Sequence, residues 1–114
     1  MFDIRKGKII LIAKIDNVRF IIKAIDKKEG GWGYIWNGCP HIMGKSGAFT
    51  KDNTFISVEE AENHIKTILN NGWYRDDITR ECFEIISVKQ YEDTDFGFFW
   101  YTEDCYNEIM KKSK

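Results

Sequence analysis

The first apolar segments of the chain predict a β-hairpin over residues 8–25. Two runs rich in β-branched residues, KIILIAKI and VRFIIKAI, lie on either side of Asp16 and Asn17. These two residue types tolerate the positive φ that a two-residue turn requires. Because side chains alternate along each strand, such a turn makes one side of the hairpin wholly apolar and leaves the other side half polar.

A third strand is predicted after the glycine-containing stretch DKKEGG. The segment WGYIWN alternates with a period of two, which places Trp32, Tyr34 and Trp36 on one side of an extended strand. An antiparallel arrangement with the hairpin is the simplest one. Residues 38–53 contain glycines and few apolar side chains, and we expect them to form a long loop.

The clearest helix is predicted to begin at Ser57. Ser57 is a good N-cap, and Glu60 three residues later completes a capping box. Gly72 ends the helix, since glycine adopts the left-handed C-terminal conformation at low cost. The apolar positions fall on one stripe with a period of 3.6 residues, and they are Val58, Ala61, Ile65, Ile68 and Leu69.

The C-terminal part of the chain predicts two further strands and a short helix. Residues 81–91 (ECFEIISVKQY) and 96–101 (FGFFWY) are rich in β-branched and aromatic residues. Thr102 is expected to cap the closing helix, and Lys111 and Lys112 lie at the negative end of its dipole.

These elements predict an α+β fold in one domain that spans residues 1–114. The expected order is β-β-β-α-β-β-α, with an antiparallel sheet of about five strands and two helices packed on one face. A chain of 114 residues has the commonest domain size, and its 43% apolar content excludes a disordered chain. The N-terminal apolar run is too short for a signal peptide or a membrane span. We therefore expect a cytoplasmic protein without membrane contact.

The charges are distributed unevenly along the chain, although the net charge is only −1. Residues 1–56 carry ten Lys or Arg against five Asp or Glu, and residues 57–114 carry seven against thirteen. Folding is expected to bring the two halves together and to cancel most of this difference. Lys outnumbers Arg by 13 to 4, and there are 17 Ile, a composition that we interpret as typical of an AT-rich bacterial or phage genome.

No catalytic residue, metal site or cofactor is predicted. Gly44-Lys45-Ser46 resembles the end of a phosphate-binding loop, but Cys39 occupies the position of the first required glycine. Potential zinc ligands are not arranged in two close pairs, since only Cys39 and His41 are near each other. A Cys39 thiol activated by His64 is conceivable, but His64 lies beside the helical apolar stripe and a structural role is favoured.

The most unusual segment runs from Tyr91 to Glu108, which holds seven aromatic residues and six acids without a Lys or Arg. Large apolar area combined with one sign of charge is typical of surfaces that bind proteins. The leading hypothesis is a small non-enzymatic interaction protein, encoded by a phage or mobile element, that binds and inhibits another protein, such as a nucleic-acid-handling defence protein. The predicted partner-binding residues are Phe96, Phe98, Trp100, Glu92, Asp93, Asp95, Asp76 and Asp77. A second copy of the chain is another possible partner.

The alternative hypothesis is a module that binds a nucleotide or single-stranded nucleic acid. Three aromatic rings on one side of a strand can stack on bases, and lysines or arginines on the neighbouring hairpin can contact phosphates. The residues of this alternative ligand site are Trp32, Tyr34, Trp36, Lys14, Arg19 and Lys23. The competing interpretation is that the three rings fill the core beneath the helix that begins at Ser57.

Overall fold

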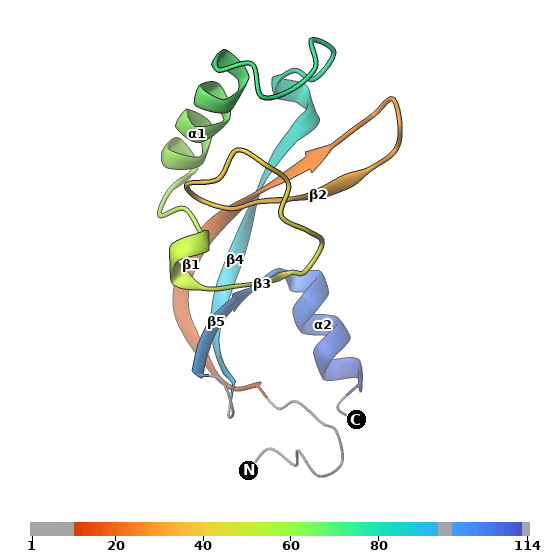
Figure 1. Ribbon diagram of the computed structural model, residues 1–114. Coiled ribbons are helices and arrows are strands. Elements are labelled where there is room, and N and C mark those ends of the chain that lie inside the picture. Colours follow the sequence, from red (N-terminus) through yellow and green to blue (C-terminus); the bar gives the residue numbers. More distant parts are fainter. Residues whose placement is uncertain (1–10, 94–96, 113–114) are drawn as a thin grey trace.

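The computed structural model describes residues 11–93 and 97–112, which form a five-stranded antiparallel sheet and two helices (Figure 1). The order of strands in the sheet is β2-β1-β4-β5-β3. The predicted α+β class is confirmed, and the element types follow the predicted order β-β-β-α-β-β-α, although the three strands before α1 are not the three predicted ones. The strands are β1 (Leu11–Ile25), β2 (Trp32–Ile35), β3 (Ala48–Phe49), β4 (Phe83–Asp93) and β5 (Gly97–Tyr101), and the helices are α1 (Val58–Asn70) and α2 (Glu103–Lys112).

The predicted N-terminal hairpin is wrong, because β1 is one continuous strand of 15 residues. It pairs along its length with β4, and the register shifts between Ile15 and Val18. Asp16 and Asn17 are therefore the extra residues of a bulge and do not form a turn. No described non-glycine residue has a positive φ, so neither Asp16 nor Asn17 adopts the conformation that the predicted turn requires. The long ladder with β4 gives hydrogen-bond partners to the backbone of β1 on both sides of the bulge.

The expected loop over residues 38–53 contains some regular structure. It includes the two residues of β3 and a 3₁₀ turn at Lys51–Asn53. Its first part follows the free edge of β2, where the Tyr34 amide donates to the Gly44 carbonyl at 2.7 Å and the Met43 amide donates to the Tyr34 carbonyl at 2.8 Å. The loop therefore covers one edge of the sheet, an edge that would otherwise expose unpaired backbone groups.

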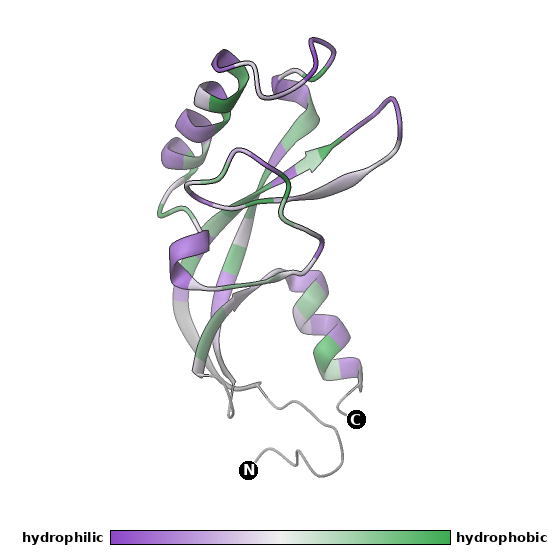
Figure 2. Ribbon diagram, in the orientation of Figure 1, coloured by the Kyte–Doolittle hydropathy of each residue, from purple (hydrophilic) through white to green (hydrophobic). Residues whose placement is uncertain are grey.

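The sheet curls so strongly that its two edge strands meet. The Tyr34 ring on β2 contacts the Phe49 ring on β3, with 5.2 Å between the ring centroids. The concave face encloses an inner core, which consists of Ile21, Tyr34, Phe49, Val88 and Trp100. The hydropathy colouring in Figure 2 shows hydrophobic positions along β1 and β4, the two central strands that carry this core and the outer core described below.

Trp100 lies in this inner core with only 4% of its surface exposed. Its indole Nε1 is buried and has no hydrogen-bond partner among the described residues. A lost hydrogen bond costs about 1–3 kcal/mol, whereas burying roughly 150–250 Å² of ring at about 25 cal/mol per Å² contributes about 4–6 kcal/mol. Burial of the ring therefore outweighs the unpaired N–H group.

Helix α1 covers the convex face of the sheet. Ser57 caps it as predicted, since its Oγ accepts a hydrogen bond from the Glu60 amide at 3.1 Å. Gly72 follows the helix with a φ of 71°, the left-handed conformation expected there. The helix and the sheet together form an outer core, whose main residues are Ile22, Ile35, Phe55, Ala61, Ile65, Ile68 and Phe83.

Helix α2 packs at the other end of the same face. Its apolar residues contact Tyr91 and Tyr101, and the Tyr91 and Tyr106 rings stack with centroids 4.4 Å apart. Thr102 caps the helix as predicted, because its Oγ1 accepts from the Cys105 amide at 3.1 Å. Phe83 near α1 and Tyr91 near α2 are both odd-numbered positions of β4, and side chains of one parity share a face. The prediction of two helices on one face is confirmed.

We predict that Gly47→Ala destabilises the protein by about 1–3 kcal/mol, the usual cost of overpacking. Gly47 precedes β3, and a Cβ there would lie 2.6 Å from Thr102 Oγ1 and 2.8 Å from Cys105 Cβ. Urea denaturation should show the loss as a lower midpoint. Gly31→Ala is the matched control, since a Cβ on Gly31 would meet nothing within 4 Å. Equal midpoints for the two variants would contradict the close packing of Gly47 against α2.

Candidate functional site

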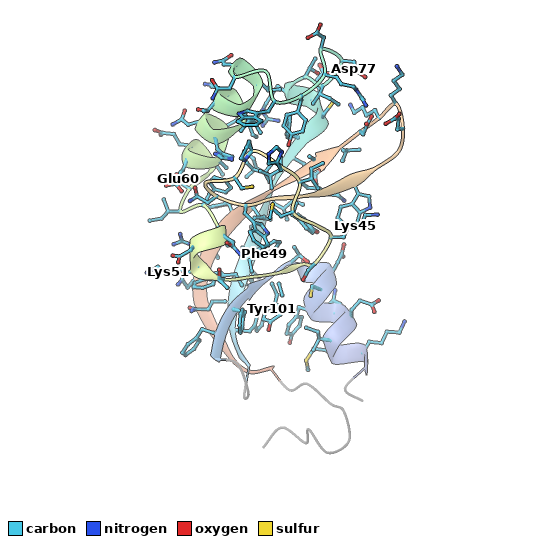
Figure 3. All side chains as sticks on the ribbon, viewed as in Figure 1. Lys45, Phe49, Lys51, Glu60, Asp77 and Tyr101 are labelled. Atoms are coloured by element: carbon cyan, nitrogen blue, oxygen red, sulfur yellow. The ribbon has the colours of Figure 1, made fainter. Side chains whose placement is uncertain are left out.

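The predicted acidic and aromatic residues do not form one surface. Asp77 and Tyr101 lie apart in Figure 3, and the segment that holds Asp76 and Asp77 leads through Cys82 into the start of β4, whereas Phe98 pairs with the last residues of that strand. Eleven residues of β4 at roughly 3.3 Å per residue separate the two groups by about 30 Å. Asp76 and Asp77 are therefore far in space from Phe98, although all three belong to the acidic half of the sequence.

The rings near the C-terminus are mostly enclosed within the chain itself. Trp100 belongs to the inner core, Tyr101 is buried against α2, and Phe99 is half-buried. Phe98 is the exception, with 47% of its surface exposed. Asp95 and Phe96 lie outside the described residues, as do the side chains of Glu92 and Asp93. Of the predicted aromatic contacts that the structure describes, only Phe98 can reach a partner.

The aromatic residues of β2 share one side of the strand, as predicted. Trp32, Tyr34 and Trp36 all face the inner core, whereas α1 packs on the opposite face of the sheet. The interpretation that they lie beneath the helix is therefore wrong. Tyr34 is buried, and both tryptophans are half-buried at the rim of the inner core.

The predicted cations of the alternative site separate in the structure. Lys23 lies with its Nζ 4.6 Å from the centroid of the Trp32 ring. Arg19 contacts a different ring, that of Trp100, and its Nε donates to the Thr54 hydroxyl. The side chain of Lys14 lies outside the described residues. Sequence reasoning missed Lys45, whose Nζ lies 5.2 Å from the same Trp32 ring as Lys23.

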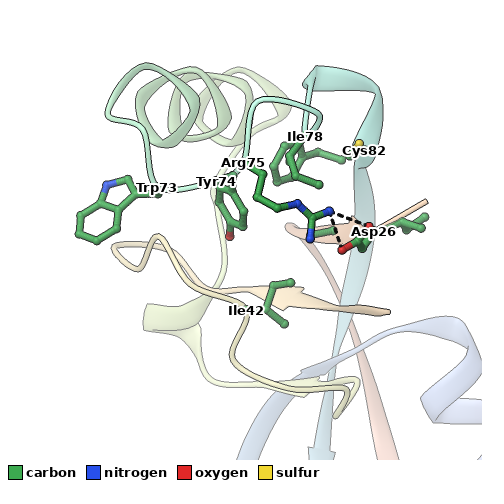
Figure 4. A pocket seen from close by; sticks show the side chains of 10 residues that line it. Asp26, Ile42, Trp73, Tyr74, Arg75, Ile78 and Cys82 are labelled. Atoms are coloured by element: carbon green, nitrogen blue, oxygen red, sulfur yellow. Dashed lines mark hydrogen bonds and ion pairs between the residues drawn. The ribbon is translucent and has the colours of Figure 1, made fainter. Parts of the chain in front are cut away.

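A pocket that the sequence did not predict lies between the segment that follows α1 and the end of β1 (Figure 4). We call it the Trp73 pocket; its volume is about 230 Å³. Aromatic and aliphatic side chains make up most of its wall, with Asp26 and Arg75 at one side. The lining residues are Ala24, Ile25, Asp26, Ile42, Trp73, Tyr74, Arg75, Ile78, Cys82 and Phe83.

Tyr74 fixes the inner wall of this pocket. Its hydroxyl donates to the Pro40 carbonyl at 2.5 Å, and its ring meets the Phe83 ring edge-on at 5.7 Å between centroids. Desolvation raises the pKa of Tyr74 to about 12, so the hydroxyl keeps its proton and remains a donor at neutral pH. Nearby, His64 Nε2 lies 2.8 Å from the Cys39 carbonyl. These two contacts hold the 39–40 backbone, which belongs to the segment after β2, against α1 and the segment that follows α1.

Arg75 closes the opposite side of the pocket. Its guanidinium contacts Asp26 at 3.0 Å, Asp77 at 2.9 Å and Glu29 at 3.3 Å. Asp26 also accepts hydrogen bonds from the amides of Lys28 and Glu29 and so shapes the turn after β1. One arginine therefore joins that turn to the segment after α1. We call this group the Arg75 tie.

The rim of the Trp73 pocket is apolar and exposed. Trp73 is 51% exposed, and Ile42 and Met43 are each 43% exposed. The His41 ring meets the Trp73 ring edge-on at 5.2 Å between centroids, which adds a further ring beside the pocket. Large apolar side chains gathered in this way are typical of interaction sites, whereas single exposed ones are ordinary.

The arrangement of cysteine and histidine does not favour nucleophilic chemistry. His64 contacts the backbone carbonyl of Cys39. Burial raises the pKa of the Cys105 thiol, which makes a thiolate less available. Among the described residues there is no group of three or more His, Cys, Asp or Glu placed to hold a metal ion. In the same part of the chain no helix is long and apolar enough to cross a membrane.

Comparisons with protein-family models, with curated proteins and with solved structures give no match.

We predict that the Arg75 tie opens in acid. Backbone hydrogen bonds, chiefly from Glu29, and the Arg75 guanidinium lower the pKa of Asp26 below its ordinary 3.8, and Arg75 does the same for Asp77. Because these folded-state values are lowered, both carboxylates stabilise the tie above about pH 4, and this contribution is lost as the pH falls through the lower values.

Carboxyl-carbon NMR titration of Asp26 and Asp77 measures this directly. In Arg75→Gln the pKa of Asp77 should return towards its ordinary value, whereas that of Asp26 should return only in part, since its backbone hydrogen bonds remain. Identical titration curves for Asp77 in the two proteins would show that the guanidinium is not its partner.

Proposed function

We propose that this protein is a non-enzymatic binding module whose partner is another protein. In this proposal the partner inserts an apolar side chain into the Trp73 pocket and covers the rim around it. The observation that carries the proposal is a mostly apolar pocket whose lining includes the exposed side chains of Trp73 and Ile42. Interfaces of this kind gain most of their affinity from a few buried aromatic or aliphatic anchors.

The size of the pocket favours a side chain over a separate small molecule. Sites for drug-sized ligands occupy about 300–1,000 Å³, and the Trp73 pocket, at about 230 Å³, is smaller. The pocket is also fixed before binding, by Tyr74 on one side and the Arg75 tie on the other. A preformed site lowers the entropy that association costs.

The charges around the pocket favour a partner with basic groups near its anchor. Arg75 is surrounded by three carboxylates, and Asp76 and Glu81 add two more exposed acids. Lys27 and Lys28 offset part of this charge, so the excess is small. This small negative charge orients the approaching partner more than it contributes to the binding affinity. A protein that handles nucleic acid carries such basic surface, which agrees with the hypothesis of a defence protein as the target.

We predict that Ile42→Arg and Trp73→Ala each weaken partner binding by at least about tenfold, because each removes apolar contact area at the rim. Affinity capture from a lysate of the source organism identifies the retained protein, and titration with that purified protein gives the dissociation constants. Ile56→Arg is the matched control. Ile56 is 64% exposed but does not line the pocket, so this variant should bind as the parent does.

Equal binding by Ile42→Arg and Ile56→Arg would refute the assignment of the partner surface. Sedimentation at several concentrations tests a second copy as the occupant. If the protein forms a dimer and Ile42→Arg dissociates it, the occupant of the pocket is a second copy of this chain and not another protein.

A further inference from the structure

A second cleft lies beside Trp32, away from the Trp73 pocket. Its volume is about 380 Å³, within the range of sites for small ligands. Four segments build it: β1, β2, the end of the loop before β3, and the start of α2. The lining residues are Lys23, Trp32, Tyr34, Lys45, Gly47, Thr102, Asp104, Cys105 and Glu108. We call it the Trp32 cleft.

Two ammonium groups converge on one ring in this cleft. The Nζ atoms of Lys23 and Lys45 lie 4.6 Å and 5.2 Å from the centroid of Trp32. The π-electrons of tryptophan attract both cations. No carboxylate among the described residues lies within 4.0 Å of either Nζ atom. Two like charges are therefore held near one ring without a direct ion pair among the described residues, although Glu84 lies opposite Lys23 in the β1–β4 ladder.

Two carboxylates lie on α2, which borders the same cleft. Asp104 and Glu108 are four residues apart, so they share one face of the helix. Both are exposed, and neither forms an ion pair with a described Lys or Arg. The cleft thus contains both signs of charge, and the opposite charges do not pair with each other.

A buried tyrosine adds a fixed polar group. Tyr34 is 7% exposed, and desolvation raises the pKa of its hydroxyl, which also interacts with the Thr102 side chain. The hydroxyl therefore stays protonated at neutral pH. Gly47 borders the cleft as well, and the close approach of its backbone to Thr102 keeps this corner rigid.

We propose that the Trp32 cleft binds a small zwitterion that carries an anionic group at one end and an ammonium group at the other. The anionic end contacts Lys23 and Lys45, the ammonium end contacts Asp104 and Glu108, and the connecting chain passes beside Trp32. A plain anion is repelled by the two carboxylates and a plain cation by the two lysines. A ligand with both charges meets complementary groups at each end.

The test compares three probes of similar length and different charge. These are ε-aminocaproate, which is a zwitterion, caproate, which has only the anionic end, and hexylamine, which has only the cationic end. Titration calorimetry should give a dissociation constant for ε-aminocaproate at least about tenfold lower than for either of the others. Phosphoethanolamine, added as a fourth probe, shows whether a phosphate serves better than a carboxylate as the anionic end.

NMR locates the binding and separates it from the proposed function. The indole N–H signal of Trp32 should shift on titration, and that of Trp73 should not. Lys45→Gln and Glu108→Gln should each weaken the zwitterion by about tenfold, whereas Lys51→Gln, at an exposed lysine that does not line the cleft, should not. Trp73→Ala tests the other site and should leave this binding unchanged.

Two results would overturn the proposal. If caproate binds as tightly as ε-aminocaproate, the ammonium group contributes nothing and the cleft is a site for anions alone. An unchanged Trp32 signal at millimolar concentrations of all four probes would show that the cleft holds no such ligand, whatever the outcome of the partner-binding experiments.

Discussion

The antiparallel ladder between β1 and β4 is the interaction on which the rest of the structure depends. It runs from the pair Leu11 and Asp93 to the pair Ala24 and Phe83, and β2 and β5 attach to its two sides. Both apolar cores are built on these two strands, since Ile21 and Ile22 point to opposite faces and are both fully buried. The ladder also brings the basic half of the sequence against the acidic half, as in the pairing of Lys23 with Glu84.

Local signals in the sequence predicted the helices and strands well where the responsible atoms lie close together along the chain. Ser57 and Thr102 cap their helices through side chains that reach three residues ahead. The failure at Asp16 and Asn17 has a different cause. Their side chains suit a turn but also a bulge, and the choice depends on β4, about 70 residues further along. Ala48 and Phe49 form a strand too short to leave a pattern.

The candidate sites could be predicted only in part, because loops assemble them. The pairing of Lys23 with Trp32 and Tyr34 follows from adjacent strands and was expected. Lys45 joins them from a loop that shows no periodicity. The Arg75 tie connects residues 49 positions apart in the sequence, and no spacing rule identifies such a contact. In the acidic segment the density of aromatic residues reflected core packing, since Trp100 and Tyr101 are buried.

The curl of the sheet explains why both sites lie at its margins. Where the two edge strands meet, the side chains of Tyr34 and Phe49 fill the space between them, and α1 and α2 cover much of the convex face. The Trp73 pocket and the Trp32 cleft both lie where a loop meets the segment beside a helix end. Such positions combine a rigid frame with side chains that vary freely without disturbing the core. A change of partner or ligand can therefore come from exposed residues of the 42–45 and 73–78 segments and of α2, with most of the β1–β4 ladder unchanged.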